Sequence, residues 1–357
     1  MTPLIIISTK IPQEKISYLS FLTEKLIEND INTTLLHHPA LTFSKKIKHG
    51  NIFQLTNIDS SFLSLLFLPF LLLIQTIRLA RYAFVYKPTT LILATTTDQL
   101  LFTLPAKLFR IPTYWIFPQT PPRLFRPLWN ITSSHATTIL DFPSLAQIFH
   151  LSTKKIVIIP AVIFSKQQEL PTQSLPHTQQ QRFILGTAGP LTLESGIEYI
   201  IKAIPLAREI LPDIQLIVVG DGPEKRNLQW LISQLGLKEH IRLVGDHQRE
   251  KWMKHFNLFL FTPTHSLVSH TPLLEAMNAG CPVIATDLPT TRDIIAPSKQ
   301  GILVPSMNSE MIAQGMINLF NHPDWRKTMG GLARKKIQDQ FSLEKTIQSF
   351  VQIFSQS

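Results

Sequence analysis

Short apolar runs alternate with amphipathic segments along the chain, and this alternation constrains the fold more than any other feature. Buried strands are continuous apolar runs, whereas the segments between them place apolar residues at helical spacing. Strands that alternate with helices are typical of a parallel sheet covered by helices on both faces. The runs that predict strands in the first half are residues 4–9, 33–36, 90–94, 112–117 and 155–159, with helices over 14–29 and 100–108.

The same alternation begins again after a polar segment, which predicts a second α/β domain. Residues 166–182 are polar, contain two prolines and show no periodicity, so we expect an interdomain linker there. A length of 357 residues suits two domains of ordinary size, here 1–165 and 183–340, followed by a C-terminal segment over 341–357. The second half predicts strands at 183–187, 214–219, 241–244, 258–261 and 282–286, and helices at 195–210 and 228–235.

Glycines and charges are distributed unevenly between the two halves. Gly50 is the only glycine before Gly186, and the other 12 lie from Gly186 onwards. Residues 1–160 hold 15 Lys and Arg against 7 Asp and Glu, a balance of +8, whereas residues 161–357 hold 19 against 17, a balance of +2. A basic first domain indicates an anionic partner. We expect a phospholipid surface rather than nucleic acid, because the chain has no basic run interleaved with aromatic residues.

Residues 60–77 carry no charge and are followed by Arg78, Arg81 and Lys87. As a helix these 18 residues would be about 27 Å long, slightly short of the roughly 30 Å hydrocarbon core of a bilayer. Pro69 would also kink such a helix. We therefore expect a core or interfacial helix, with a transmembrane span as the alternative. The basic residues that follow favour partial insertion at an anionic surface.

The sharpest local feature runs from Ser269 to Gly280. Thr271 suits the N-cap of a helix, Pro272 its first position and Gly280 its C-terminal stop. Because this helix follows a strand, its amino end should face the edge where open α/β sheets bind ligands, and free amides there favour a phosphate. Glu275, one turn inside, can accept hydrogen bonds from a ribose diol. The alternative is that Glu275 only caps or pairs locally.

The cysteine count and the carboxylate pattern bear on disulfide and metal sites. Cys281 is the only cysteine, which excludes a disulfide scaffold and a Cys-based zinc site, and it lies in an apolar run. Asp221 belongs to a Gly-Asp-Gly-Pro segment that predicts a turn. We find no paired carboxylates for a metal and expect no metal or other cofactor. The residues after Met1 lack the apolar core and cleavage site of a signal peptide, so we expect a cytoplasmic protein.

The second half also resembles a known family. Residues 183–354 are similar to the nucleotide-binding domain of the retaining glycosyltransferases of family 4, known as glycosyl transferases group 1. This resemblance implies the GT-B fold, in which two Rossmann-like α/β domains with parallel sheets face each other across a cleft. It also implies that the C-terminal helix, over 342–354, crosses back to the first domain. The segments that carry the resemblance are Gly186–Gly189, Glu194–Ala203, Leu216–Pro223, Ile241–Gly245, Pro272–Asp287 and Gly301–Pro305.

The resemblance assigns residues to a nucleotide-sugar donor site. Glu275 matches the second glutamate of the family's Glu-x7-Glu motif, which holds the donor ribose. Gly189 matches the glycine beside the diphosphate, and the segment from Val244 to Asp246 lies where the base is held. The turn whose amides meet the diphosphate is matched by Ser269, His270 and Thr271.

Three positions depart from the family pattern. Leu267 stands where the first glutamate of the motif is expected, and Pro190 and Ser195 stand where the family has the two cations that neutralise the diphosphate. Each charge-assisted hydrogen bond contributes roughly 1.5–3 kcal/mol, so losing both would cost about 3–6 kcal/mol. That corresponds to a factor on the order of 10²–10⁴ in binding or rate. Either other groups substitute for them or transfer activity has been lost.

Several residues are candidates for substitution or catalysis. A protonated His270 at the helix N-terminus could supply part of the missing positive charge, and Lys10 could reach the cleft from the first domain. The family's mid-domain histidine has no clear counterpart, and Asp98 and Gln119 are the nearest residues. Residues 8–14 stand in place of the family's first glycine-rich loop. Further histidines near the donor positions are His247 and His265.

Together these features predict a glycosyltransferase that uses a nucleotide diphosphate sugar and a lipid-linked or cell-envelope glycan acceptor. The basic, apolar first domain would lean on the inner face of the cytoplasmic membrane. The first alternative is a catalytically impaired homologue that binds a glycan, a lipid or a protein. The second alternative is an epimerase or hydrolase of the same fold.

Overall fold

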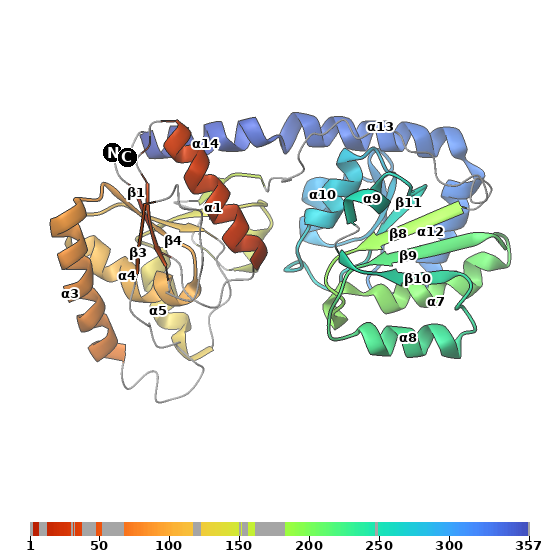
Figure 1. Ribbon diagram of the computed structural model, residues 1–357, viewed down its shortest axis with the longest axis horizontal. Coiled ribbons are helices and arrows are strands. Elements are labelled where there is room, and N and C mark those ends of the chain that lie inside the picture. Colours follow the sequence, from red (N-terminus) through yellow and green to blue (C-terminus); the bar gives the residue numbers. More distant parts are fainter. Residues whose placement is uncertain are drawn as a thin grey trace. The chain divides into compact units, whose positions relative to one another are not determined.

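Two compact units make up the chain (Figure 1). The computed structural model describes residues 3–6, 13–29, 31, 33–37, 48–51, 68–116, 123–149, 151, 156–160, 183–246 and 249–355. Unit 1 comprises Met1–Pro160 and Glu344–Ser357, and unit 2 comprises Ala161–Leu343. The C-terminal residues therefore belong to the same unit as the N-terminal residues. The expected linker, residues 166–182, lies outside the described residues.

Unit 1 is built on a seven-stranded sheet with the order β3-β2-β1-β4-β5-β6-β7. Every pair of neighbouring strands runs parallel, as the alternation of strands and helices predicts. The strand order reverses between β1 and β4, and ligands of open α/β sheets bind at such a reversal. The strands are β1 (Pro3–Ile6), β2 (Thr34–His37), β3 (Lys48–Asn51), β4 (Thr90–Leu93), β5 (Thr113–Ile116), β6 (Thr137–Leu140) and β7 (Ile156–Ile158).

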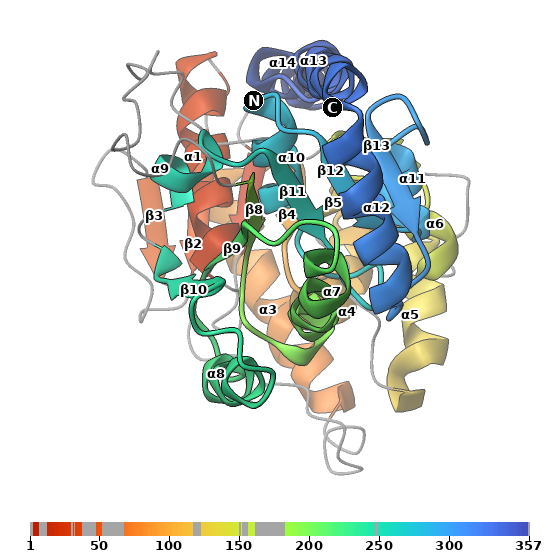
Figure 2. The same cartoon turned by 90° about the vertical axis from the view of Figure 1, so that its right-hand side faces the viewer.

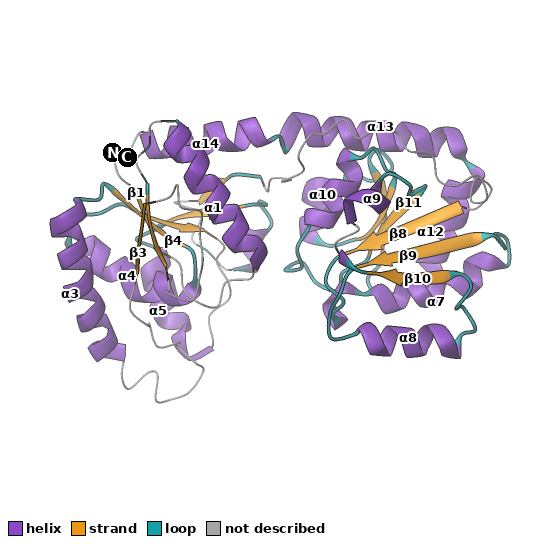
Figure 3. Ribbon diagram, viewed as in Figure 1, coloured by secondary structure: helices purple, strands orange, loops and turns teal. Residues whose placement is uncertain are grey.

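Helices cover both faces of the unit 1 sheet (Figure 3). On one face, Leu19 of α1 packs in a buried cluster with Phe350 and Phe354 of α14. On the other face, α3, α4 and α5 pack around Trp115 and Trp129. The helices of this unit are α1 (Gln13–Glu28), α3 (Leu68–Tyr86), α4 (Thr96–Leu108), α5 (Arg126–Ser133), α6 (Leu145–Ile148) and α14 (Leu343–Ser355).

Helix α3 differs in its start from the helix expected over 60–77. It begins at Leu68, and residues 60–67 lie outside the described part of the chain. Pro69 is the second residue of the helix, where the amide of a first-turn residue has no intrahelical acceptor. The helix on the amino-terminal side of Pro69, where a kink was expected, lies outside the described residues. No helix among the described residues is long and apolar enough to cross a membrane.

Unit 2 repeats the architecture with a six-stranded sheet in the order β10-β9-β8-β11-β12-β13. All neighbouring strands are again parallel, and the order reverses between β8 and β11. The strands are β8 (Phe183–Ala188), β9 (Ile214–Val219), β10 (Ile241–Val244), β11 (Leu258–Phe261), β12 (Val283–Thr286) and β13 (Gly301–Val304).

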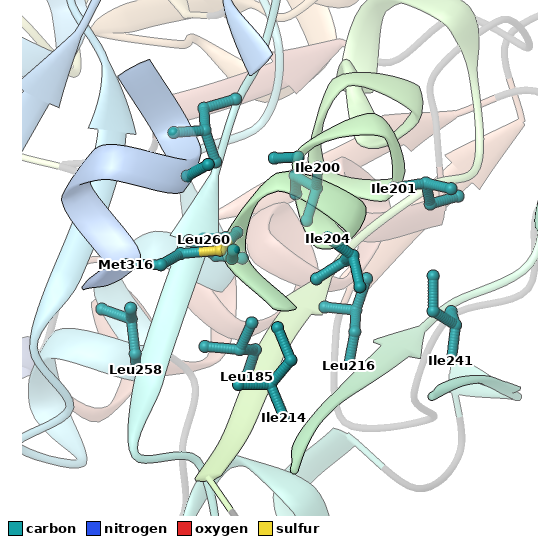
Figure 4. Close-up of a cluster of buried hydrophobic side chains, with 14 of the residues drawn as sticks. Leu185, Ile200, Ile201, Ile204, Ile214, Leu216, Ile241, Leu258, Leu260 and Met316 are labelled. Atoms are coloured by element: carbon teal, nitrogen blue, oxygen red, sulfur yellow. The ribbon is translucent and has the colours of Figure 1, made fainter. Parts of the chain in front are cut away.

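The core of unit 2 lies between its sheet and the pair α7 and α12, which pack against each other (Figure 2). Ile200 and Ile204 of α7 and Met316 of α12 meet Leu216 and Leu260 of the sheet (Figure 4). The helices of this unit are α7 (Ile197–Arg208), α8 (Lys225–Gln234), α9 (Arg249–Met253), α10 (Thr271–Asn278), α11 (Pro289–Ile294), α12 (Ser309–Asn321) and α13 (Pro323–Gln340).

Some element boundaries differ from the expectation for local physical reasons. Helix α7 begins at Ile197 rather than at Ser195, because Gly196 has a left-handed φ of 65° and ends a short 3-10 turn over Leu193–Ser195. Three strands, β3, β6 and β13, were not expected from the sequence. Strand β3 is a polar segment at the edge of its sheet, and β6 is a four-residue run that begins with two threonines.

Candidate functional site

A surface hollow lies where the carboxyl ends of β8 and β11 meet the amino end of α10. Because β8 and β11 are the neighbours at which the strand order of unit 2 reverses, the hollow occupies the position where open α/β sheets bind ligands. It is lined by Thr187, Ala188, Gly189, Pro190, Ser195, Ile197, Phe261, Thr262, Pro263, Val268, Ser269 and Pro272.

The hollow brings together three of the expected donor-site residues, Gly189, Ser195 and Ser269. Pro190, which replaces an expected cation, lies beside them. Among the described residues that line the hollow, none has an ionisable side chain. An anion bound here would therefore be met by neutral groups and by the positive amino end of α10.

Gly189 is required by the backbone at the rim of the hollow. Its φ is 138°, a conformation that residues with a side chain rarely adopt. The turns after β8 and β9 also approach closely here, since the Gly189 amide donates to the Val219 carbonyl at 3.0 Å. A Cβ on Gly220 would lie 2.0 Å from the Gly189 carbonyl oxygen. The glycines of the second half thus keep two strand ends close together.

Hydroxyl groups around the hollow are already engaged with the backbone. The Ser195 hydroxyl donates to the Thr192 carbonyl at 2.6 Å. The Thr262 hydroxyl donates to the Gly196 carbonyl at 3.1 Å and joins the turn before α7 to the end of β11. The hydroxyl hydrogens of Ser195 and Thr262 are therefore committed to the backbone.

The amino end of α10 has its cap one residue earlier than expected. The helix begins at Thr271, and His270 occupies the N-cap position without a side-chain capping bond. The expectation that Thr271 is the N-cap is therefore wrong. The Ser269 hydroxyl donates to Thr271 Oγ1 at 3.2 Å and shapes the turn. At the other end, Gly280 has a φ of 79°, which confirms it as the glycine that stops the helix.

His270 is buried at this turn and does not carry the expected charge. Burial lowers the pKa of His270 to about 4, and a hydrogen bond to the Val268 backbone opposes the shift. The imidazole is therefore neutral at physiological pH. Its ring centroid lies 5.4 Å from that of Phe261. The expectation that a protonated His270 replaces the missing positive charge is wrong, because the side chain is packed in the interior.

Glu275 and Asp246 share one guanidinium group. Nη2 and Nε of Arg249 donate to Asp246 Oδ1 at 2.5 and 2.9 Å, and Nη1 lies 3.6 Å from Glu275 Oε2. Helix α9 thus ties the turn after β10 to α10. The sequence analysis missed Arg249, although its spacing of three residues from Asp246 at the start of a helix is a signal for an ion pair. Because two carboxylates share this guanidinium, Arg249 does not replace the absent cations.

The remaining donor-site positions flank this ion pair and the hollow. Val244 is the last residue of β10 and is half-buried. Leu267 is 48% exposed in the loop after β11, where its amide donates to His265 Nδ1 at 3.2 Å. An exposed apolar side chain therefore stands where the family has its first glutamate. The expected residues Lys10, Gln119 and His247 lie outside the described residues.

Asp98 is the one described candidate in unit 1. It lies in the first turn of α4, directly after β4 and next to the reversal of strand order in that sheet. Its carboxyl group accepts a hydrogen bond from the Thr95 hydroxyl, and Thr95 Oγ1 caps the Asp98 amide at 3.2 Å. Burial raises the pKa of Asp98 to about 7, and these bonds to Thr95 oppose the rise. A carboxyl group that is partly protonated near neutral pH suits proton transfer, and the Asp98 side chain is fully buried.

Comparisons with known proteins agree with this architecture. Residues 172–336 match the family Glycosyl transferases group 1. An uncharacterised glycosyltransferase of Methanocaldococcus jannaschii is 29% identical over 233 residues, which cover 55% of this chain and 56% of that protein. The chain thus spans about half the length of this curated relative.

Solved structures match over the whole chain. A glycosyltransferase from Rickettsia africae has a TM-score of 0.81 with 16% identity and covers 99% of this chain and 98% of its own. An Anabaena protein solved in complex with UDP has a TM-score of 0.78 with 16% identity and covers 100% of both chains. Residues 172–336 thus match the model of the Glycosyl transferases group 1 family, and the chain has the GT-B fold.

Proposed function

We propose that the chain is a retaining glycosyltransferase of the family 4 type. It transfers a sugar from a nucleotide diphosphate sugar to a glycan or lipid-linked acceptor. The observation that carries the proposal is the hollow at the strand reversal of unit 2, which lies within the residues that match the group 1 family. The Anabaena structure of the same fold, which holds UDP, supports a nucleotide ligand.

Because the lining of the hollow is uncharged, a diphosphate would bind there without a side-chain cation. The amino end of α10, with the positive end of the helix dipole, lies beside the hollow. This dipole stabilises the charge that develops on the leaving diphosphate when the bond to the sugar breaks. The donor site therefore depends on the helix dipole rather than on the two side-chain cations of the family.

Glu275 holds the ribose in this proposal. Its carboxylate accepts hydrogen bonds from the ribose hydroxyls, and Arg249 positions the carboxylate from 3.6 Å. The segment from Val244 to Asp246 holds the base. Asp98 and Gln119 are the candidates for catalysis in unit 1, and His270 acts as a neutral packing residue.

Calorimetry with UDP-, GDP- and ADP-sugars tests the donor site. We expect binding of one nucleotide class, weakened about 10- to 100-fold by Glu275→Gln, because a charge-assisted hydrogen bond contributes roughly 1.5–3 kcal/mol. The matched control is Glu209→Gln, which removes an exposed carboxylate at the end of α7. Absence of binding to every nucleotide sugar would contradict the proposed transferase.

A catalytically impaired homologue is the second candidate function. It is favoured by Leu267, Pro190 and Ser195, together with the neutral state of His270. Such a protein would bind a glycan, a lipid or a protein without transferring sugar. Turnover of the nucleotide sugar that calorimetry identifies, with and without acceptors, separates the two functions. Binding without any release of nucleotide diphosphate would favour the impaired homologue.

The proposed place of action is the inner face of the cytoplasmic membrane. The +8 charge balance of residues 1–160 supports an anionic surface as the partner of unit 1. Lipid-linked acceptors are held at such a surface, so a transferase that docks there meets its acceptor within a short distance.

A further inference from the structure

One side of α3 is apolar and exposed. Phe70, Leu73, Ile77 and Phe84 are 61, 58, 55 and 86% exposed. Their spacings of three, four and seven residues place them along one side of the helix, and over 14 residues this stripe is about 21 Å long. Leu79, on the opposite side of the helix, is buried in the core. The stripe is therefore the side of α3 that the sheet does not cover.

The apolar surface continues at the amino-terminal edge of the unit 1 sheet. The Leu91 amide donates to the Pro112 carbonyl at 2.9 Å, so the turns before β4 and β5 lie side by side. Lys87 and Arg110 occupy these turns, with left-handed φ values of 44° and 56°. Leu108, which is 74% exposed, and Phe109 directly precede Arg110. The last turn of α3 and the end of α4 thus present apolar and basic side chains together.

This surface carries positive charge without negative charge. Between Leu68 and Leu140 the chain has seven Lys and Arg and a single acidic residue, Asp98. Asp98 is fully buried inside unit 1. Arg81 is exposed within the apolar stripe, between Ile77 and Phe84. A side chain of this length can lie along apolar neighbours and still place its charge in a polar layer.

We propose that the apolar stripe of α3, with the edge residues Leu108, Phe109 and Arg110, docks on an anionic phospholipid surface. Helix α3 lies in the plane of the membrane, with the stripe among the acyl chains near the headgroups and Arg81 and Lys87 at the phosphates. A stripe of apolar residues rimmed only by cations has the pattern that interfacial helices show. This inference rests on the membrane-side action proposed above and names the surface that carries it out.

Two other occupants fit this surface less well. A second copy of the chain related by two-fold symmetry would place the same cations opposite each other without a carboxylate to pair them. A nucleic acid would meet the cations but would leave the apolar stripe exposed to water, and such interfaces are predominantly polar. An anionic bilayer satisfies both the charge and the apolar area.

Co-sedimentation with lipid vesicles tests the charge requirement. We expect binding to vesicles that contain phosphatidylglycerol, weak binding to pure phosphatidylcholine, and release at high salt. The triple variant Arg81→Gln, Lys87→Gln, Arg110→Gln should weaken binding about 100-fold, since each basic residue near an anionic surface contributes a factor of about five. The control is Arg226→Gln, Lys238→Gln, Arg242→Gln, which removes the same charge from exposed positions of unit 2.

A fluorescent label tests whether the stripe enters the bilayer. Cys281 is buried, so a cysteine placed on the surface is labelled selectively. An environment-sensitive dye on Ile77→Cys should shift to shorter wavelength with phosphatidylglycerol vesicles, whereas the same dye on exposed Gln229→Cys should not. No shift at position 77, equal binding to neutral vesicles, or self-association without lipid would overturn the docking. A protein that binds a nucleotide sugar but not vesicles would overturn this inference alone.

Discussion

The buried carboxyl group of Asp98 makes the stability of unit 1 depend on pH. Its pKa of about 7 lies above the ordinary value of 3.8, and the rise is caused first by burial. The folded state therefore holds a proton that the unfolded chain releases between about pH 4 and pH 7. Stability contributed by this group is present at low pH and is lost as the pH rises through the folded pKa.

Replacing Asp98 by Asn should remove this dependence. We expect the unfolding free energy of the native protein to fall by roughly 3 kcal/mol between pH 5 and pH 8, since each unit of pH contributes about 1.4 kcal/mol. The Asp98→Asn variant should lack this fall. Chemical denaturation at both pH values measures it, with Glu28→Gln, an exposed position on α1, as the control. An equal fall in Asp98→Asn and in the native protein would contradict the assignment.

Residues of the candidate site were predictable where a backbone rule fixes them. Gly280 could be predicted because the residue that stops a helix favours glycine, whereas Gly189, which also has a positive φ, was assigned through the family resemblance. The charge of His270 could not be predicted, because protonation depends on burial by side chains that are distant in sequence. Arg249 was missed because its contact with Glu275 joins two helices that are more than twenty residues apart, and no local pattern reports such a contact.

At the scale of elements, the packing of α10 on α13 depends on Gly280 and Gly330. A Cβ on Gly330 would lie 2.1 Å from the Gly280 carbonyl oxygen, at the end of α10. Neither helix can keep its position if that Cβ is present. The neighbouring Gly331 is exposed, and a Cβ there would meet nothing within 4 Å.

Gly330 and Gly331, both in α13, form a matched pair for a stability experiment. Gly330→Ala should lower the unfolding free energy of unit 2 by about 1–3 kcal/mol, because the two helices must move apart. Gly331→Ala should raise it by up to about 1 kcal/mol, because alanine favours the helix. Urea denaturation of both variants measures the difference. Equal effects of the two substitutions would show that the close approach of α10 and α13 does not determine stability.

The sequence predicted most of the described strands but only about half of the described helices, and the exceptions are informative. Continuous apolar runs such as Ile214–Val219 are buried on both faces of a parallel sheet, so their pattern alone identifies them. Strand β3 could not be found, because an edge strand has fewer neighbours and its residues, Lys48–Asn51, are polar. The start of α3 was not predicted correctly from the uncharged run over residues 60–77. An uncharged run indicates burial or membrane affinity, but it does not indicate where the first turn of a helix lies.

At the scale of the whole molecule, the two units have separate cores but are joined through the last helix. The core around α7 and α12 lies within unit 2, whereas α14 completes the cluster that includes Leu19 of unit 1. The Thr346 hydroxyl donates to the Pro160 carbonyl at 3.3 Å, so residues 186 positions apart in sequence meet. No local pattern in the sequence indicates this pairing, and only the family resemblance implied it.

Substitution of Phe354 tests this arrangement in the intact chain. The Phe354 side chain is buried, with its ring edge-on to Tyr114 at 5.3 Å and stacked on Phe350 at 5.9 Å. Phe354→Ala should destabilise unit 1 by about 3–5 kcal/mol, because it leaves a cavity against the sheet. Gln352→Ala, at an exposed position of the same helix, should have little effect.

Differential scanning calorimetry distinguishes the two units in this experiment. A nucleotide sugar that binds unit 2 raises only the transition of that unit, which identifies it. The Phe354→Ala substitution should then lower the other transition and leave the nucleotide-sensitive transition in place. A fall of both transitions by the same amount would mean that the two cores unfold together. A fall of the nucleotide-sensitive transition alone would mean that α14 stabilises unit 2 rather than unit 1.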